Sequence, residues 1–306
     1  MKEKKASFTA TLMAYYRAYH AMHETPKIFD DFLAHRLVKE EERASIENQI
    51  AESLKLFDSA RAASCLDRAT ALRWMMREAL AAPSLILGRS RYSEDSLENS
   101  VLQGVQQYVI LGAGMDTFAF RRPEMLEKLQ VFEVDHPATQ AVKFHRLAQA
   151  GWEQPEQLHF VPVDFEKESL AEALMRSPYD PKIPGFFSWL GVTYYLTRDA
   201  IFATLRAIAG ISPPGGTVVF DYMDTDAFVP GRVARRVDMI QKSARQMGEP
   251  MITGFDPPSL TAELASIGLR LHEDLSPADI QERYFRGRTD GYRACEHAHF
   301  AWALVE

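Results

Sequence analysis

The segment Val109-Ile-Leu-Gly-Ala-Gly-Met-Asp116 decides how the chain folds, because an apolar run leads directly into a Gly-x-Gly turn. Gly112 and Gly114 lack Cβ atoms, so the backbone can turn tightly there and approach a ligand closely. Such a turn by itself is also compatible with a strand-to-helix connection that binds nothing. A pyrophosphate-binding loop would carry a third glycine where Thr117 stands. We therefore expect a nucleoside ligand other than a dinucleotide.

Short apolar runs and stretches of helical periodicity alternate along the chain from this segment onward. Strands are predicted at 108–111, 131–134, 158–163, 185–190, 216–221, 269–274 and 299–305. Helices are predicted at 137–150, 166–175, 198–209, 227–246 and 259–267. Strands that alternate with helices indicate a parallel sheet with crossover helices. We expect an α/β fold with an open, doubly wound (Rossmann-like) sheet of seven strands, mostly parallel with an antiparallel last strand.

The residues before the first strand have helical patterns only. Helices are predicted at 6–22, 27–38, 40–57, 66–80 and 93–102. We expect residues 1–100 to form a helical cap and residues 101–306 to form the ligand-binding domain. An insertion at 226–258 is rich in glycine and proline. It is typical of a mobile element that closes on a substrate.

Composition excludes several classes of protein. The 306 residues carry 35 basic and 42 acidic side chains, a net charge of −7 that disfavours a nucleic-acid binder. Two cysteines, Cys65 and Cys295, are too few for a disulfide framework or a zinc cluster, so we predict no metal and a reducing, cytoplasmic location. We find no run of about 18 apolar residues, so no membrane span is predicted. Nothing in the sequence indicates the oligomeric state.

Two acidic residues end the second predicted strand, in Glu133-Val-Asp135. They follow Gly114 by 19 and 21 residues. A carboxylate about 20 residues after a glycine turn is placed to accept hydrogen bonds from the hydroxyls of a ribose. We expect one of the two to face the ligand; the alternative for either is a solvated carboxylate at a strand end.

The third predicted strand ends in Val163-Asp164-Phe165. Ligands of open α/β sheets bind beyond the carboxyl ends of the strands, near the switch point of the topology. Asp164 is placed there to accept a proton from an adenine amino group, and Phe165 to pack on the ring. Alternatively, Asp164 caps the helix that follows.

These motifs, taken in order, resemble those of a known family. Gly112-Ala-Gly114-Met-Asp116-Thr, Phe132-Glu-Val-Asp135-His-Pro137 and Val163-Asp164-Phe165 are similar to successive motifs of leucine carboxyl methyltransferase-like enzymes. These are class I methyltransferases that depend on S-adenosylmethionine (SAM). The resemblance covers most of the chain and extends to Tyr16-Arg-Ala18, Phe29-Asp-Asp31, Arg89-Ser-Arg-Tyr92 and Gly191-Val-Thr-Tyr-Tyr-Leu-Thr197.

The resemblance implies SAM as the cofactor and assigns its contacts. In that family the glycine turn holds the methionine part of SAM. The acid after the second strand binds the ribose, and the third motif binds the adenine. The implied cofactor-binding residues are Gly112, Ala113, Gly114, Asp116, Glu133, Asp135, His136, Asp164, Phe165 and Leu190. Basic residues that grip the donor carboxylate fall on Arg17 and on Arg89 or Arg91. A guanidinium suits this role because it can bind a carboxylate with two parallel hydrogen bonds; the alternative for each is a surface cation or a structural ion pair.

One departure from the family pattern concerns the acceptor. The family usually places Glu directly before Gly-Val in the motif after the fourth strand, whereas Leu190 precedes Gly191-Val192 here. The exchange indicates a smaller or more apolar acceptor than a protein terminus. We predict O-methylation of a small molecule at a carboxylate or hydroxyl, as in secondary metabolism. A protein C-terminal carboxyl methyltransferase and a non-catalytic SAM-binding protein are the alternatives, and Thr117 makes a nicotinamide-dependent dehydrogenase a distant fourth.

No catalytic residue is identified from the sequence. A carboxylate acceptor needs no general base, whereas a phenol or an alcohol does. His136, Tyr194, Tyr195 and His299 are the candidates, and a structural role is favoured for each.

Overall fold

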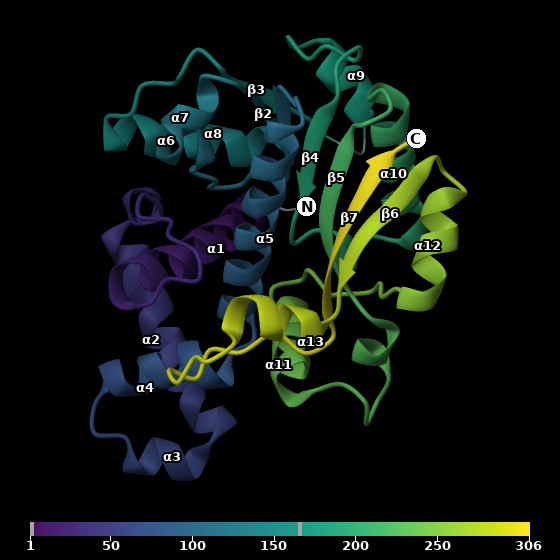
Figure 1. Ribbon diagram of the computed structural model, residues 1–306. Helices are drawn as coiled ribbons and strands as arrows, with labels where there is room; N and C mark the ends of the chain where they lie inside the picture. The colour runs from purple at the N-terminus through teal and green to yellow at the C-terminus, as the bar shows by residue number, and fades with distance from the viewer. Residues whose placement is uncertain (1–2, 165–166) are drawn as a thin grey trace.

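A seven-stranded sheet in the order β3-β2-β1-β4-β5-β7-β6 lies at the centre of the computed structural model, which describes residues 3–164 and 167–306 (Figure 1). Its strands are β1 Gln107–Leu111, β2 Gln130–Asp135, β3 Leu158–Pro162, β4 Gly185–Trp189, β5 Thr217–Met223, β6 Leu269–Leu275 and β7 Ala298–Val305. Strands β1 to β5 pair in parallel, and β7 runs antiparallel to both β5 and β6. The predicted fold class is confirmed.

Helices cover both faces of the sheet, which explains why its central strands are apolar at nearly every position. In β1, Tyr108 and Ile110 point into one core and Val109 and Leu111 into the other. The first face carries α5 (Ala82–Leu102), α6 (Phe118–Arg121), α7 (Pro123–Leu126), α8 (Pro137–Ala150) and α13 (Pro277–Ile280). The second face carries α9 (Leu170–Met175), α10 (Arg198–Ile211) and α12 (Pro257–Ala265) (Figure 1).

The helices at the N-terminus have a core of their own. They are α1 (Glu3–His23), a 3-10 turn at Ala34–Leu37, α2 (Glu40–Phe57), α3 (Ser59–Ser64), α4 (Arg68–Trp74) and a π-helical turn at Met75–Ala79. Their shared core contains Tyr15, Tyr16, Tyr19, Ile46, Ile50, Leu54, Met75 and Met76. Helix α5 packs on β4, β5 and β7, and Leu85, Leu87, Tyr92 and Leu97 belong to the core of the sheet, whereas Ile86 belongs to the N-terminal core. The last helix of the first hundred residues therefore joins the two parts.

The insertion after β5 is docked on these N-terminal helices. It contains a 3-10 turn at Thr225–Phe228 and α11 (Arg235–Gln246). The guanidinium of Arg235 lies 4.1 Å from the ring centroid of Phe57. Arg236, only 3% exposed, donates to the carbonyl oxygens of Leu80 and Ala294. These two arginines hold α11 on the rest of the protein.

Several predicted helices differ from the observed ones. The helix predicted at 27–38 is wrong apart from the turn at Ala34–Leu37, because the carboxylate of Asp31 is held by tertiary bonds to Arg17 and Thr117. The helix predicted at 93–102 is the second half of α5. The first turn of α5 contains Pro83, and proline is tolerated there because the N–H groups of a first helical turn have no partner within the helix. The helix predicted at 166–175 begins only at Leu170, where Ser169 and Glu172 form a capping box.

A buried hydrogen bond between Lys143 and Glu133 fixes α8 to the sheet. The Nζ atom of Lys143 on α8 donates to Oε2 of Glu133 on β2, and both side chains are 1% exposed. Burial raises the pKa of Glu133 to about 7, although the positive charge of Lys143 opposes the shift. The carboxyl group therefore holds a proton in the folded protein at pH values where a glutamate of the unfolded chain, with a pKa of about 4.3, has lost it.

This difference predicts a pH-dependent stability. Between about pH 4.5 and 7 the folded state binds more protons than the unfolded state, so the free energy of unfolding falls as pH rises, by up to ~1.4 kcal/mol per unit. Glu133→Gln removes this contribution. Urea unfolding at several pH values across the window measures the effect as a difference in slope between the two proteins. A difference in unfolding free energy that stays constant with pH would contradict the prediction.

Candidate active site at the switch point between β1 and β4

The strand order reverses direction between β1 and β4. The connections that follow these two strands cross to opposite edges of the sheet, and this leaves a crevice beyond the carboxyl ends of the two strands. The structure brings the segments that follow β1, β2, β3 and β4 to this edge. Four predicted motifs that are far apart in the sequence therefore meet here.

The glycine turn after β1 has a conformation and surroundings that favour glycine. Gly112 has φ +71° and Gly114 has φ +53°. A Cβ atom on Gly112 would lie 3.2 Å from Cγ2 of Val192, and one on Gly114 would lie 3.2 Å from Cβ of Ala10. The segment after β4 and helix α1 thus approach the turn as closely as its missing side chains allow, while the Gly112 backbone remains exposed. Ala113, between the two glycines in the sequence, is buried.

The carboxylate of Asp135 joins the end of β2 to this turn. Its Oδ2 atom accepts a hydrogen bond from the Gly114 amide at 2.5 Å, and Oδ1 accepts one from the His136 amide at 2.6 Å. Burial raises the pKa of Asp135, and these two amides oppose the shift. Glu133 lies on the same face of β2 but is deeper and bound to Lys143. Of the two predicted acids, Asp135 therefore reaches the turn.

His136 and Asp164 lie at the beginnings of the segments after β2 and β3. The Nδ1 atom of His136 accepts a hydrogen bond from the Ala138 amide at 3.2 Å and so caps α8. Asp164 is half-buried, and its Oδ2 atom accepts from Nζ of Lys167 at 2.6 Å. Ser169 caps α9, so the alternative role of Asp164 as the cap of that helix is wrong. Phe165 lies outside the described residues.

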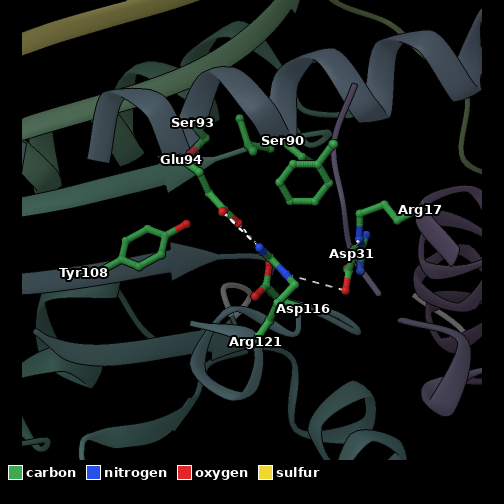
Figure 2. Close-up of a pocket in the computed structure, with 10 residues that line it drawn as sticks. Arg17, Asp31, Ser90, Ser93, Glu94, Tyr108, Asp116 and Arg121 are labelled. Atoms are coloured by element: carbon green, nitrogen blue, oxygen red, sulfur yellow. Dashed lines mark hydrogen bonds and ion pairs between the residues drawn. The ribbon is translucent and has the colours of Figure 1, made fainter. Parts of the chain in front are cut away.

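A polar pocket opens beside the glycine turn, between β1 and α5 (Figure 2). Its lining consists of Arg17, Phe29, Asp31, Ser90, Ser93, Glu94, Tyr108, Asp116, Arg121 and Leu190. Three predicted cofactor residues, Arg17, Asp116 and Leu190, are among them. The Oδ1 atom of Asp116 accepts a hydrogen bond from the Phe118 amide at 2.7 Å. The pocket lining combines charged side chains of both signs with the apolar side chains of Phe29 and Leu190.

An ion network holds the charged wall of this pocket in place. Nε of Arg17 donates to Oδ2 of Asp31 at 2.8 Å, and its Nη2 donates to the Met115 carbonyl at 2.7 Å. Arg121 lies between Asp31 and Glu94 and donates to both oxygens of Glu94 (Figure 2). Burial alone would raise the pKa of Asp31, but Arg17 and Arg121 hold it below its usual value.

Of the two arginines predicted on α5, Arg89 lies at the switch point. Its Nη1 atom donates to the Tyr194 hydroxyl at 2.9 Å and to Oδ2 of Asp221 at 3.0 Å. A Cβ atom on Gly191, which has φ +76°, would lie 2.4 Å from Nη2 of Arg89, so this guanidinium packs directly against the backbone after β4. Arg91 is exposed and pairs with Asp95 at 2.8 Å, so the structure does not bring it to the site.

The two tyrosines among the predicted base candidates are not prepared to accept a proton. Burial raises the pKa of Tyr195 to about 12 and that of Tyr194 well above its ordinary value, so both phenols stay protonated at neutral pH. His299 stacks on Tyr222 with 4.9 Å between ring centroids and does not line the pocket.

Sequence reasoning missed Arg121, Glu94 and Asp221. A strand-end signal existed for Asp221, which closes the predicted strand at 216–221. Arg121 and Glu94 gave no local signal, because their contacts join segments that are distant in the sequence. Within residues 3–164 and 167–306 we find no group of three or more His, Cys, Asp or Glu side chains suited to a metal ion. No helix in the same ranges is both long and apolar enough to cross a membrane.

Comparison with known structures supports the fold. A DUF574 family protein from Streptomyces avermitilis superimposes with a TM-score of 0.58 at 12% identity, covering 96% of this chain and 97% of that one. A protein from Thermobifida fusca described as a methyltransferase superimposes with a TM-score of 0.54 at 14% identity, covering 84% and 94% of the two chains. At these identities the likeness concerns the fold alone.

Comparison with known sequences identifies the family. Residues 10–209 match the model of the leucine carboxyl methyltransferase family. A Bacillus subtilis protein whose name is that of an S-adenosyl-L-methionine-dependent methyltransferase, YktD, is 39% identical over 305 residues, which cover 99% of each chain. The expected cofactor is thereby confirmed. The chain belongs to the leucine carboxyl methyltransferase family and is a SAM-dependent methyltransferase.

Proposed function

We propose that this methyltransferase transfers a methyl group to an oxygen atom, carboxylate or hydroxyl, of a small molecule. The observation that carries the proposal is the apolar wall that Leu190 contributes to the pocket next to the end of β4. The family name refers to methylation of a carboxyl group, which supports an oxygen acceptor. An apolar wall favours an uncharged part of a small acceptor at this point over the backbone of a protein terminus.

The residues at the switch point fit SAM. The two positive-φ glycines leave room for close approach of a ligand to the backbone of the turn. Asp135 would hold the ribose hydroxyls, since a carboxylate at the turn can accept two hydrogen bonds. Asp164 would hold the adenine amino group, and Asp116 with Ala113 would border the methionine part. Arg17 would bind the donor carboxylate, with Arg89 close to the end of β4.

SAM, when bound, supplies a methyl group that is already activated on a sulfonium. The protein therefore contributes mainly position, and well-oriented reactants can gain up to about 7–11 kcal/mol from this effect. The buried ion network around Arg17 and Arg121 keeps the pocket wall rigid. Tyr194 and Tyr195 act as walls, because their raised pKa values keep both phenols protonated.

The acceptor side is covered by two segments. Helix α1 packs on the glycine turn through Ala10. The insertion reaches α1 through the hydrogen bond from Oγ1 of Thr9 to Oε2 of Glu249, at 2.9 Å. A covered site favours a small acceptor over the terminus of a folded protein. Methyl transfer to a protein C-terminus and SAM binding without catalysis remain the alternatives that the following experiment separates.

A screen with radiolabelled SAM tests the proposal directly. Phenols, alcohols and carboxylic acids are offered as acceptors, together with peptides that end in a free carboxylate. We expect labelled product from at least one small molecule and none from the peptides. Product from the peptides alone would favour the protein carboxyl methyltransferase, and donor binding without any product would favour a binding protein.

Asp135→Ala is expected to weaken SAM binding. Loss of the carboxylate leaves the amides of Gly114 and His136 and the ribose hydroxyls without their acceptor, which costs about 1–3 kcal/mol, or about 5- to 150-fold in Kd. Isothermal titration calorimetry measures the change. Asp199→Ala, at an exposed acid in the first turn of α10, serves as the matched control. Equal affinities of the wild type and Asp135→Ala would remove Asp135 from the donor site.

Arg17→Lys and Arg91→Lys are expected to behave differently. Lysine keeps the positive charge but lacks the planar fork that binds a carboxylate with two hydrogen bonds. We expect Arg17→Lys to raise the Kd for SAM by about tenfold, the loss of one charge-assisted hydrogen bond. Arg91→Lys should leave it unchanged, since Arg91 is exposed on α5. Thermal unfolding checks that Arg17→Lys still folds, and a larger effect from Arg91→Lys would reverse the assignment.

A further inference from the structure

We propose that Glu249 receives the proton of the acceptor, which is therefore a neutral alcohol or phenol rather than a carboxylic acid. This inference rests on the proposed function and narrows it. Glu249 belongs to the insertion, between α11 and α12. No sequence motif pointed to it.

Contacts with α1 bring Glu249 to the carboxyl end of β1. Its Oε2 atom accepts a hydrogen bond from Oγ1 of Thr9 at 2.9 Å. The next residue of α1 is Ala10, whose Cβ would lie 3.2 Å from a Cβ on Gly114. The half-buried carboxylate of Glu249 is thus one residue of α1 away from the glycine turn.

Contacts of the same loop bring Glu249 to the end of β4. The Ile252 amide donates to the Tyr194 carbonyl at 2.7 Å, and Oγ1 of Thr253 donates to the Leu196 carbonyl at 2.5 Å. Burial raises the pKa of Tyr195 to about 12, and the negative charge of Glu249 adds to the shift. Glu249 therefore lies between the ends of β1 and β4, over the switch point where an open α/β sheet binds its ligand.

The charges around Glu249 select the acceptor. The positive charge of Arg89 is balanced by Asp221, and both neighbouring tyrosines are neutral. Among the side chains that the structure describes, residues 8–164 and 167–306, Glu249 forms a hydrogen bond with Thr9 and no ion pair, and we infer that this side of the site keeps one negative charge. A carboxylate acceptor would be repelled by it, by up to about 4 kcal/mol at 4 Å near a protein surface. A hydroxyl group instead donates a hydrogen bond to it, and charge-assisted bonds of this kind are short and strong.

The proton balance of methyl transfer agrees with this position. The acceptor oxygen forms a bond to the methyl carbon and loses its proton to Glu249. The electron pair of the broken carbon–sulfur bond stays on the donor sulfur, and Glu249 passes the proton to solvent. A carboxylate acceptor carries no proton to lose and would gain nothing from Glu249.

The experiment compares alcohols and phenols with matched carboxylic acids. The first pairs of a wider set are 2-phenylethanol with phenylacetic acid, which share a carbon skeleton, and phenol with benzoic acid, which share the aromatic ring. Wild type, Glu249→Gln and Glu282→Gln are assayed with labelled SAM; Glu282, which pairs with Arg286 on the surface, is the matched control. We expect methylation of hydroxyl compounds by the wild type and the control. Glu249→Gln should lower kcat by about 10²–10⁴-fold, the usual contribution of a general base. Its KM should change only a few-fold, because the amide oxygen still accepts a hydrogen bond.

A binding measurement accompanies the assay. In the presence of S-adenosylhomocysteine, Glu249→Gln should bind the carboxylic acids at least about tenfold more tightly than the wild type does, because a negative charge has been removed. The Kd for SAM should be the same in all three proteins. A wild type that binds SAM but methylates only carboxylic acids, or methylates none of the hydroxyl compounds, would overturn the proposal, as would a Glu249→Gln variant with the kcat of the wild type. Failure to bind SAM would instead refute the proposed function.

Discussion

The lack of side chains at Gly112 and Gly114 is the constraint on which the rest of the site depends. Both residues adopt positive φ, and a Cβ atom on either would crowd Val192 or Ala10. Because neither glycine has a side chain, α1 and the segment after β4 can approach the turn closely. Asp135 then bonds to the Gly114 amide and ties β2 to the same point. The order of the strands brings these parts together, and the turn allows them to meet.

The ion pairs in the charged wall of the pocket fix the positions of its side chains more than they stabilise the folded state. Taking Arg17, Asp31, Glu94 and Arg121 out of water is costly, and buried ion pairs often return little net free energy. What these bonds supply is a fixed position: Arg17 is held by Asp31 and by the carbonyl of Met115, next to the glycine turn. A donor carboxylate would meet a guanidinium that is already oriented, so less conformational entropy is lost on binding.

The segments that we propose to cover the acceptor lie outside the sheet. Helix α1 and the loop after α11 are joined by Thr9 and Glu249, and the loop is fastened to the backbone of Tyr194 and Leu196. The sheet edge is common to a large class of folds, whereas these covering segments differ in sequence and length between proteins with the same fold. Selection of the acceptor is accordingly expected to reside in the covering segments.

The sequence by itself determined the sheet and the residues at its edge. All seven strands were predicted within about two residues of their observed limits. The central strands β1, β4 and β5 gave the clearest signal, because they are buried on both faces and are apolar at nearly every position. Spacing predicted the glycine turn and a carboxylate at either Glu133 or Asp135, since a strand, a turn and the next strand have nearly fixed lengths, and the resemblance to the family favoured Asp135. Only the tertiary structure decided which residue of each candidate pair lies at the site. Glu133 and Asp135 differ by their depth along β2, and Arg89 and Arg91 by the face of α5 on which they lie. Asp31 and Arg121 are brought to the pocket by contacts between distant segments, as Glu249 is brought to α1, and no local pattern records such contacts.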